Sequence, residues 1–155
     1  MKLAWIEEPS MENPFRQPVQ VRWADLDLNG HVRHSVYYDW GASARIAFLS
    51  AHGLSVEQMA EMGFGPVLLR EEAIFRREVR YGDELWVGLL LSKARADGAR
   101  FSFRHDIVRS DGTLCAVITV DGAWIDLRQR KLTAPPEVVV EMFDGCPKAH
   151  DFTFL

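Results

Sequence analysis

The hydrophobic period of this sequence changes within residues 19–53, and this change constrains the fold more than any other feature. Apolar and polar residues alternate over 19–23, which is typical of a half-buried strand. Over 36–48 the apolar residues recur every three or four positions, which predicts an amphipathic helix. Between them, Asp-Leu-Asp-Leu-Asn-Gly at 25–30 predicts a turn, because Asn and Gly adopt left-handed backbone angles at low cost. A strand therefore turns directly into a long helix through a short polar segment, 25–34, called the corner below.

Cap residues set the limits of the predicted helices. Ser35 is the predicted N-cap of the long helix and Gly53 its stop. Ser55, which precedes Val56–Met62, predicts a short second helix that ends at Gly63.

Strand-like patterns follow the two helices. The segments are 67–79, 85–93, 100–108 and 114–125. Ser-Asp-Gly at 110–112 is a hairpin turn between the last two segments. A short amphipathic segment over 138–143 comes next, and no pattern is evident after Gly145. This order predicts an α+β domain in which one long helix covers an antiparallel sheet, with the four segments as a meander.

Length and composition predict one soluble globular domain over 1–155, with its core at about 17–132 between an N-terminal lead-in and a C-terminal tail. The apolar share of 48% with 26% charged residues is not that of a disordered chain. A net charge of −4 disfavours a nucleic-acid partner, and no run approaches the ~18 apolar residues of a membrane span. With no signal-peptide pattern in 1–17 and two cysteines without motif spacing, the expected location is cytoplasmic.

The corner places acidic side chains beside the start of a helix. Amides in the first turn of a helix are unpaired and partly positive, so they can polarise a carbonyl oxygen. A carboxylate next to that carbonyl can attack it or take a proton from water. We favour this role for Asp27, whereas Asp25 and Asn29 are interpreted as turn-capping residues.

Metal binding is the alternative interpretation of the corner. The run 25–30 matches the first half of a calcium loop, but Val36 stands where that loop needs a glutamate, and a strand precedes the run where that loop needs a helix. His31 and His34 could bind a metal together with Asp27, but no further ligand clusters near them. We therefore expect no metal and no cofactor.

Two blocks of the sequence resemble one known family. The first is Arg-Trp-Ala-Asp-Leu-Asp at 22–27, followed by Gly-His-Val at 30–32 and by a tyrosine and an Ala-Arg pair in the helix; the second is 76–85. Together they resemble the hotdog-fold acyl-CoA thioesterases of the 4-hydroxybenzoyl-CoA thioesterase type, over about 19–131. The resemblance implies a long central helix wrapped by a five- or six-stranded antiparallel sheet. It also implies homodimers, often paired into homotetramers, with active sites between subunits.

The resemblance further implies roles for the corner residues. Asp27 matches the catalytic aspartate, which acts as nucleophile or general base, and the backbone amide of His34 matches the donor to the thioester oxygen. The supporting turn consists of Asp25, Asn29, Gly30 and His31. Many relatives have Asn-Asn at positions 33–34, and no role is implied for the His34 side chain.

Coenzyme A is expected as part of the substrate, and its phosphates bind basic side chains. By resemblance, basic residues before the meander and after its last strand serve this role, which selects Arg77, Arg130 and Lys131. The predicted function is hydrolysis of an acyl-CoA to a free acid and coenzyme A, with the acyl group unidentified. Two alternatives stay open. One is a non-catalytic hotdog protein that binds an acyl ligand; the other is a hotdog hydratase, whose aspartate–histidine spacing and turn proline this sequence lacks.

Overall fold

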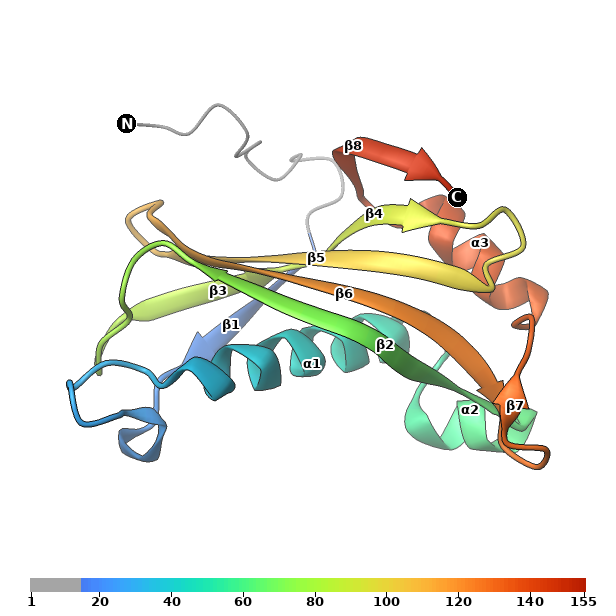
Figure 1. Ribbon diagram of the computed structural model, residues 1–155, viewed down its shortest axis with the longest axis horizontal. Helices are drawn as coiled ribbons and strands as arrows, with labels where there is room; N and C mark the ends of the chain where they lie inside the picture. Colours follow the sequence, from blue (N-terminus) through green and yellow to red (C-terminus); the bar gives the residue numbers. More distant parts are fainter. Residues whose placement is uncertain (1–14) are drawn as a thin grey trace.

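A long helix crosses one face of a curved, mainly antiparallel sheet in the computed structural model, which describes residues 15–155 (Figure 1). The strands are β1 (Arg16–Gln20), β2 (Phe64–Phe75), β3 (Glu84–Gly88), β4 (Leu90–Ala94), β5 (Arg100–Arg109), β6 (Leu114–Asp126), β7 (Lys131–Leu132) and β8 (Lys148–Phe154). The helices are α1 (His34–Ala51), α2 (Val56–Met62) and α3 (Glu137–Gly145). Among residues 15–155, no helix is both long enough and apolar enough to cross a membrane.

Helix α1 packs its apolar face on the sheet, as its period predicts. Val36, Trp40 and Ala44 are at most 8% exposed and belong to the core. Gly41 lies on the same face, and a Cβ atom there would be 3.2 Å from Cδ2 of His105. Close packing of the helix on the sheet therefore explains a glycine that costs roughly 1 kcal/mol in a helix interior.

The two helices that follow β1 begin in different ways. Helix α2 begins after Ser55, whose Oγ accepts the Gln58 amide at 3.1 Å, and it ends at the left-handed Gly63, as predicted. Helix α1 begins earlier than predicted, because Arg33 and not Ser35 is its N-cap. Within the described chain, no side chain makes a capping hydrogen bond at the start of α1.

The strand order differs from the predicted meander. The strands β1, β3, β5, β6 and β2 follow one another across the sheet, and β4 continues beside β5 where β3 ends. The first of the four predicted strands, β2, therefore pairs with β6 and not with β3. The chain between β2 and β3 has another role: the amides of Arg76 and Arg77 donate to the Cys115 carbonyl, and the Val79 carbonyl accepts the Val32 amide at 2.8 Å. This connection holds the corner against the sheet.

Among residues 15–155 the sheet has eight strands, against the five or six expected. The predicted segment 85–93 is split into β3 and β4 at Leu89, which is 1% exposed in the core. The two-residue β7 and the C-terminal β8 are further additions, and β8 runs parallel to β4. The tail after Gly145 is not predicted as a strand, because its residues show no alternation. It forms β8 by pairing with β4. The predicted lead-in lies, up to residue 14, outside the described residues.

Trp23 lies on a 3₁₀ turn and not on the predicted strand. Strand β1 ends at Gln20, and the turn Trp23–Asp25 follows. The alternating pattern placed Trp23 on the buried face with Val21, yet Trp23 is 77% exposed while Val21 is 5% exposed. The chain leaves the sheet here because the Asp25 carboxylate binds back to the residue that precedes the turn.

The core beneath α3 is a cluster of aromatic rings. The Phe101 ring lies 5.2 Å from Phe103, 5.3 Å from Trp124 and 5.5 Å from Phe143, between centroids. Gly122 is the partner of Phe101 across β5 and β6, and a Cβ atom on Gly122 would lie 2.3 Å from Cζ of that ring. The three neighbouring rings leave Phe101 little room to move away.

We expect Gly122→Ala to lower the free energy of unfolding by about 1–3 kcal/mol, the usual cost of overpacking a core. Gly65→Ala is the matched control, because its added Cβ atom would meet only Cδ2 of Leu127, at 3.6 Å. Urea unfolding of both variants measures the difference. A Gly122→Ala variant as stable as the control would mean that the aromatic cluster can rearrange.

Candidate active site

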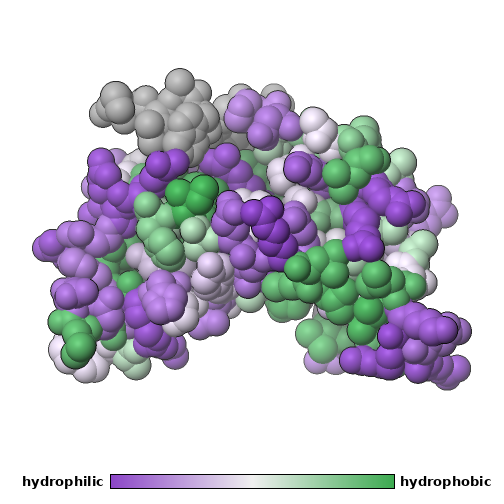
Figure 2. Space-filling view, viewed as in Figure 1, coloured by the Kyte–Doolittle hydropathy of each residue, from purple (hydrophilic) through white to green (hydrophobic). Residues whose placement is uncertain are grey.

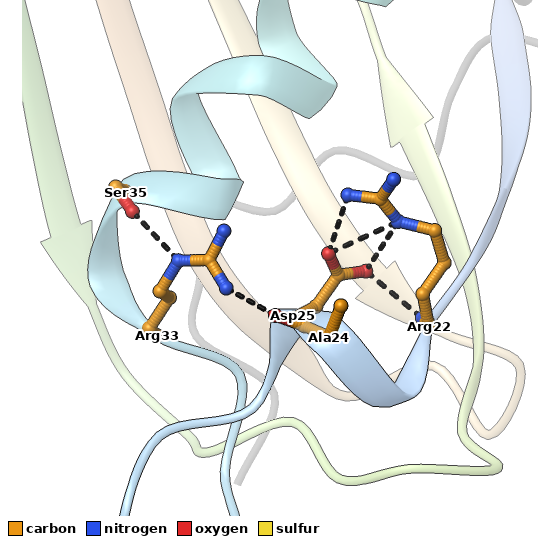
Figure 3. Close-up of polar contacts among 5 residues, drawn as sticks. All are labelled: Arg22, Ala24, Asp25, Arg33 and Ser35. Carbon is orange, nitrogen blue, oxygen red and sulfur yellow. Dashed lines mark hydrogen bonds and ion pairs between the residues drawn. The ribbon is translucent and has the colours of Figure 1, made fainter.

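Asp25 is the fixed point of the corner. It is 1% exposed, and its carboxylate accepts the backbone amide of Arg22 at 2.9 Å and the Arg22 guanidinium at 2.7 and 3.1 Å (Figure 3). The hydrogen bond from this guanidinium is the largest cause that lowers the pKa of Asp25 below its ordinary value. A charged Asp25 therefore holds the 3₁₀ turn closed.

Arg33 ties the corner to the start of α1. Its backbone amide donates to the Asp25 carbonyl at 2.8 Å. Its guanidinium donates to the Ala24 carbonyl and, at 3.2 Å, to Oγ of Ser35 (Figure 3). Sequence analysis assigned Arg33 no role, because these acceptors meet only when the turn and the helix are both formed.

Asp27 is exposed on the turn, two residues beyond the buried Asp25. Its Oδ1 accepts the amides of Asn29 at 2.9 Å and of His31 at 3.4 Å. Its backbone amide donates to the His31 carbonyl at 2.8 Å, and Gly30, with φ +74°, donates to its carbonyl at 3.1 Å. Within residues 15–155, Oδ2 of Asp27 makes no hydrogen bond. One oxygen thus holds the carboxylate in place while the other is available for chemistry.

Helix α1 starts at the end of the corner, after the turn that carries Asp27. His34 is its first residue, and the absence of a side-chain cap in the described chain leaves the first amides open. Uncapped amides at a helix start carry partial positive charge and bind an anion or a polarised oxygen. The corner therefore joins a fixed carboxylate to a short set of available donors. Such an arrangement can polarise a carbonyl and attack it.

His31 lies near a carboxylate of the second sequence block, 76–85. Its Nε2 lies 3.7 Å from Oε1 of Glu78, which also accepts Nη2 of Arg80 at 2.7 Å. The Arg80 hydrogen bond and then the His31 charge lower the pKa of Glu78. Sequence analysis did not single out Glu78, although it lies in that block. Among residues 15–155, no three His, Cys, Asp or Glu side chains form a possible metal site.

Arg45, of the Ala-Arg pair in the first block, contacts the sheet and not the corner, and its side chain is 11% exposed. Its Nη1 is 3.1 Å from Nε2 of His105, and its Nη2 is 3.8 Å from Oε1 of Glu71. Because arginine only donates, Nε2 of His105 accepts, and its Nδ1–H donates to the Gly88 carbonyl at 2.9 Å. Burial lowers the pKa of His105 to about 3, so the ring is neutral. These contacts position α1 along the sheet.

The predicted phosphate-binding residues do not come together in one chain. Arg77 follows the end of β2, on the connection that holds the corner. Arg130 and Lys131 lie in the β6–β7 hairpin, beside the start of β2. The twelve residues of β2 separate these two ends by roughly 35 Å. The hairpin itself is fixed, because Oδ1 of Asp126 accepts two amides of the turn at 2.8 Å each.

Comparisons with known proteins place this arrangement in context. The sequence profile described as the thioesterase-like superfamily matches residues 21–143. A curated protein of Aquifex aeolicus (strain VF5), provisionally named an esterase, is 26% identical over 129 residues, which are 83% of this chain and 97% of that protein. The crystal structure of a 1,4-dihydroxy-2-naphthoyl-CoA thioesterase from Synechocystis is 25% identical, with a TM-score of 0.76 over 85% of this chain and 96% of its own. A Staphylococcus aureus protein in complex with CoA is 21% identical, with a TM-score of 0.81 over 88% of this chain and 87% of its own.

The Arg22–Asp25 pair predicts that the free energy of unfolding depends on pH. A carboxyl whose pKa is lower in the folded chain stabilises the fold above its unfolded pKa, and this contribution is lost as the pH falls through the folded pKa. We expect Asp25→Asn to unfold at a lower urea concentration than the parent at neutral pH. The difference should shrink as the pH falls below 3.8, the ordinary aspartate value. Asp144→Asn, which removes an exposed carboxylate from α3, is the control. A difference that persists unchanged in acid would assign the effect to the shape of Asp25 and not to its charge.

Proposed function

Because the chain belongs to the thioesterase-like superfamily, we propose that it hydrolyses an acyl-CoA thioester to a free acid and coenzyme A. The Synechocystis relative is a 1,4-dihydroxy-2-naphthoyl-CoA thioesterase and the Staphylococcus aureus neighbour binds CoA, which supports an acyl-CoA as the substrate class. The observation that carries the proposal is the Asp27 carboxylate, held by one oxygen in the turn that leads into an uncapped helix start. Binding of an acyl ligand alone would not require a carboxylate in that place.

Two routes use the same groups. In the first, Oδ2 of Asp27 attacks the thioester carbon, the carbon–sulfur bond breaks, and the coenzyme A thiolate leaves and takes a proton from solvent; water then hydrolyses the resulting anhydride. In the second, Asp27 takes a proton from a water molecule that attacks the same carbon, and the proton passes to the leaving sulfur. In both routes the backbone amide of His34 stabilises the charge that develops on the carbonyl oxygen.

We expect Asp27→Asn to lose at least about a hundredfold in kcat, because a general base contributes ~10²–10⁴-fold and a nucleophile can contribute more. The asparagine carbonyl can accept the same two amides, so the fold and the affinity for coenzyme A should be retained. Asp39→Asn is the matched control and should keep normal turnover. Release of free thiol measures kcat, and calorimetric titration measures coenzyme A binding.

Two results would change this assignment. Near-normal turnover of Asp27→Asn would remove Asp27 from the reaction. A wild-type protein that binds acyl-CoAs but releases no thiol from any of them would favour the non-catalytic alternative. Single turnover in ¹⁸O-labelled water distinguishes the two routes, because label in the Asp27 carboxylate indicates the anhydride.

Strand β2 offers a free edge to a second copy of the chain. Among residues 15–155, β2 pairs only with β6, and its other edge is unpaired over twelve residues. Leu68, Leu69, Ile74 and Phe75 are 41–52% exposed along it. Soluble proteins normally cover such an edge. We therefore include in the proposal a homodimer in which β2 pairs antiparallel with β2 of the second copy, and two dimers can associate further.

The apolar surface extends beyond the strand. Figure 2 shows hydrophobic side chains gathered where Figure 1 places α2 and the start of β2. Val56 and Met62 of α2 are 58% and 49% exposed, and α2 contacts β2. This surface lies at the opposite end of β2 from the corner, which favours a partner that spans the whole strand.

Antiparallel pairing also accounts for the distribution of the basic residues. A two-fold axis across β2 sets the end of this strand in one copy next to its start in the other. The hairpin with Arg130 and Lys131 would then lie beside the partner's corner, near Arg77 and Asp27. The proposed site thus takes its corner from one chain and its hairpin from the other.

Mixing two impaired variants tests this arrangement. Asp27→Asn leaves the hairpin intact, and the double variant Arg130→Glu, Lys131→Glu leaves the corner intact. A dimer with one chain of each kind has one complete site, so subunit exchange should restore about a quarter of the wild-type rate at substrate concentrations below KM. Sites contained within one chain would restore nothing. Light scattering that gave only a 17.7 kDa species at micromolar concentration would contradict the dimer itself.

A further inference from the structure

Two large aromatic side chains stand in solvent next to the corner. Trp23 is 77% exposed and Tyr81 is 62% exposed. Their rings meet edge to face, with centroids 6.3 Å apart and planes at 83°. Leu28, beside Asp27 in the corner turn, is fully exposed as well. Large apolar side chains that gather on one exposed surface mark a binding site.

Rigid turns carry both rings. Trp23 opens the 3₁₀ turn that the Arg22–Asp25 hydrogen bonds hold closed. Tyr81 lies in a turn in which Oδ2 of Asp83 accepts the Arg80 amide at 2.8 Å. A ligand that contacts these rings therefore pays little for ordering the backbone beneath them.

Both turns lie close to Asp27. The backbone amide of Asp27 donates to the His31 carbonyl, and His31 pairs with Arg80, the residue before Tyr81. Two inter-strand spacings of about 5 Å put this turn roughly 10 Å from the Asp27 backbone. Trp23 precedes Asp27 by four residues, so their Cα atoms lie within about 14 Å of each other. A ligand whose reacting carbon is at Asp27 can therefore reach both rings.

We propose that Trp23 and Tyr81 form a platform that binds a planar ring of the substrate, an inference that rests on the proposed thioesterase function. A planar ring can stack on an exposed aromatic face or meet it edge to face, and both contacts are favourable. Two parts of an acyl-CoA can supply the ring: an aromatic acyl group, or the adenine of coenzyme A. The aliphatic arm between them has no ring to offer.

Three substrates distinguish these sources in Trp23→Ala and Tyr81→Ala. If the platform binds the acyl ring, KM rises about 3- to 10-fold for benzoyl-CoA and for S-benzoyl-pantetheine but not for butanoyl-CoA. If it binds adenine, KM rises for both coenzyme A esters but not for the pantetheine ester. In either case kcat changes little, because the contact is made equally in the ground and transition states. Trp23→Phe and Tyr81→Phe keep a ring and should restore most of the affinity.

Phe154→Ala is the control, because it removes a ring that is 68% exposed on β8. Titration with S-benzyl-coenzyme A, a thioether that cannot be hydrolysed, repeats the comparison without turnover. Ring binding by Trp23 and Tyr81 can therefore be disproved while hydrolysis is still observed. A failure of this inference is thus distinguishable from a failure of the proposed thioesterase function. Unchanged KM and unchanged thioether affinity in Trp23→Ala and Tyr81→Ala would overturn the proposal. Dissociation of the dimer in these variants, with unchanged ligand binding, would also overturn the proposal. The two rings would then belong to the contact between copies.

Discussion

One charge pair, formed by the exposed Arg22 and the buried Asp25, determines the path of the chain into the corner. A carboxylate removed from water destabilises the fold unless donors replace its hydration. Asp25, at 1% exposure, obtains three such donors from Arg22 alone: the backbone amide, Nε and Nη2. They converge on the carboxylate only if the chain turns back between these residues. That turn ends β1 at Gln20, exposes Trp23 and sets the direction in which Asp27 and α1 follow.

Features decided within a few residues could be predicted from the sequence, and long-range pairing could not. The cap and stop of α2 and the apolar face of α1 depend on neighbouring residues, and their predictions are confirmed. The family and its hotdog fold, predicted from two blocks, are confirmed by the superfamily match and by structures of the same fold. The pairing of β2 with β6 joins residues more than 40 positions apart. Alternation identifies a strand but carries no information about its neighbour.

At the candidate site, the sequence identified residue types but not their environments. Asp25 and Asp27 stand two residues apart in one turn, and only the fold separates a buried, paired carboxylate from an exposed one. Arg33 received no role because a long side chain binds acceptors whose positions depend on tertiary structure. Arg77 and Arg130 lie at opposite ends of β2, so a binding role for both in one site requires a second chain. No local pattern of the sequence predicts that relation, and only the family resemblance implied sites between subunits.

The local rules that this structure breaks are concentrated around the corner and the β2 edge. Elsewhere local preference and fold agree, as in α2, where Ser55 and Gln58 cap each other. A serine or aspartate N-cap at position 33 would add about 1 kcal/mol of stability, but its oxygen would accept the amide of Ser35 or Val36 and bring a competing acceptor next to the His34 amide of the proposed mechanism. Arg33 fixes the helix start without that conflict, because a guanidinium donates hydrogen bonds and cannot accept one from the amides. The stability given up at the start of α1 thus keeps competing acceptors away from the proposed donor, and the turn that carries Asp27 leads into this helix start.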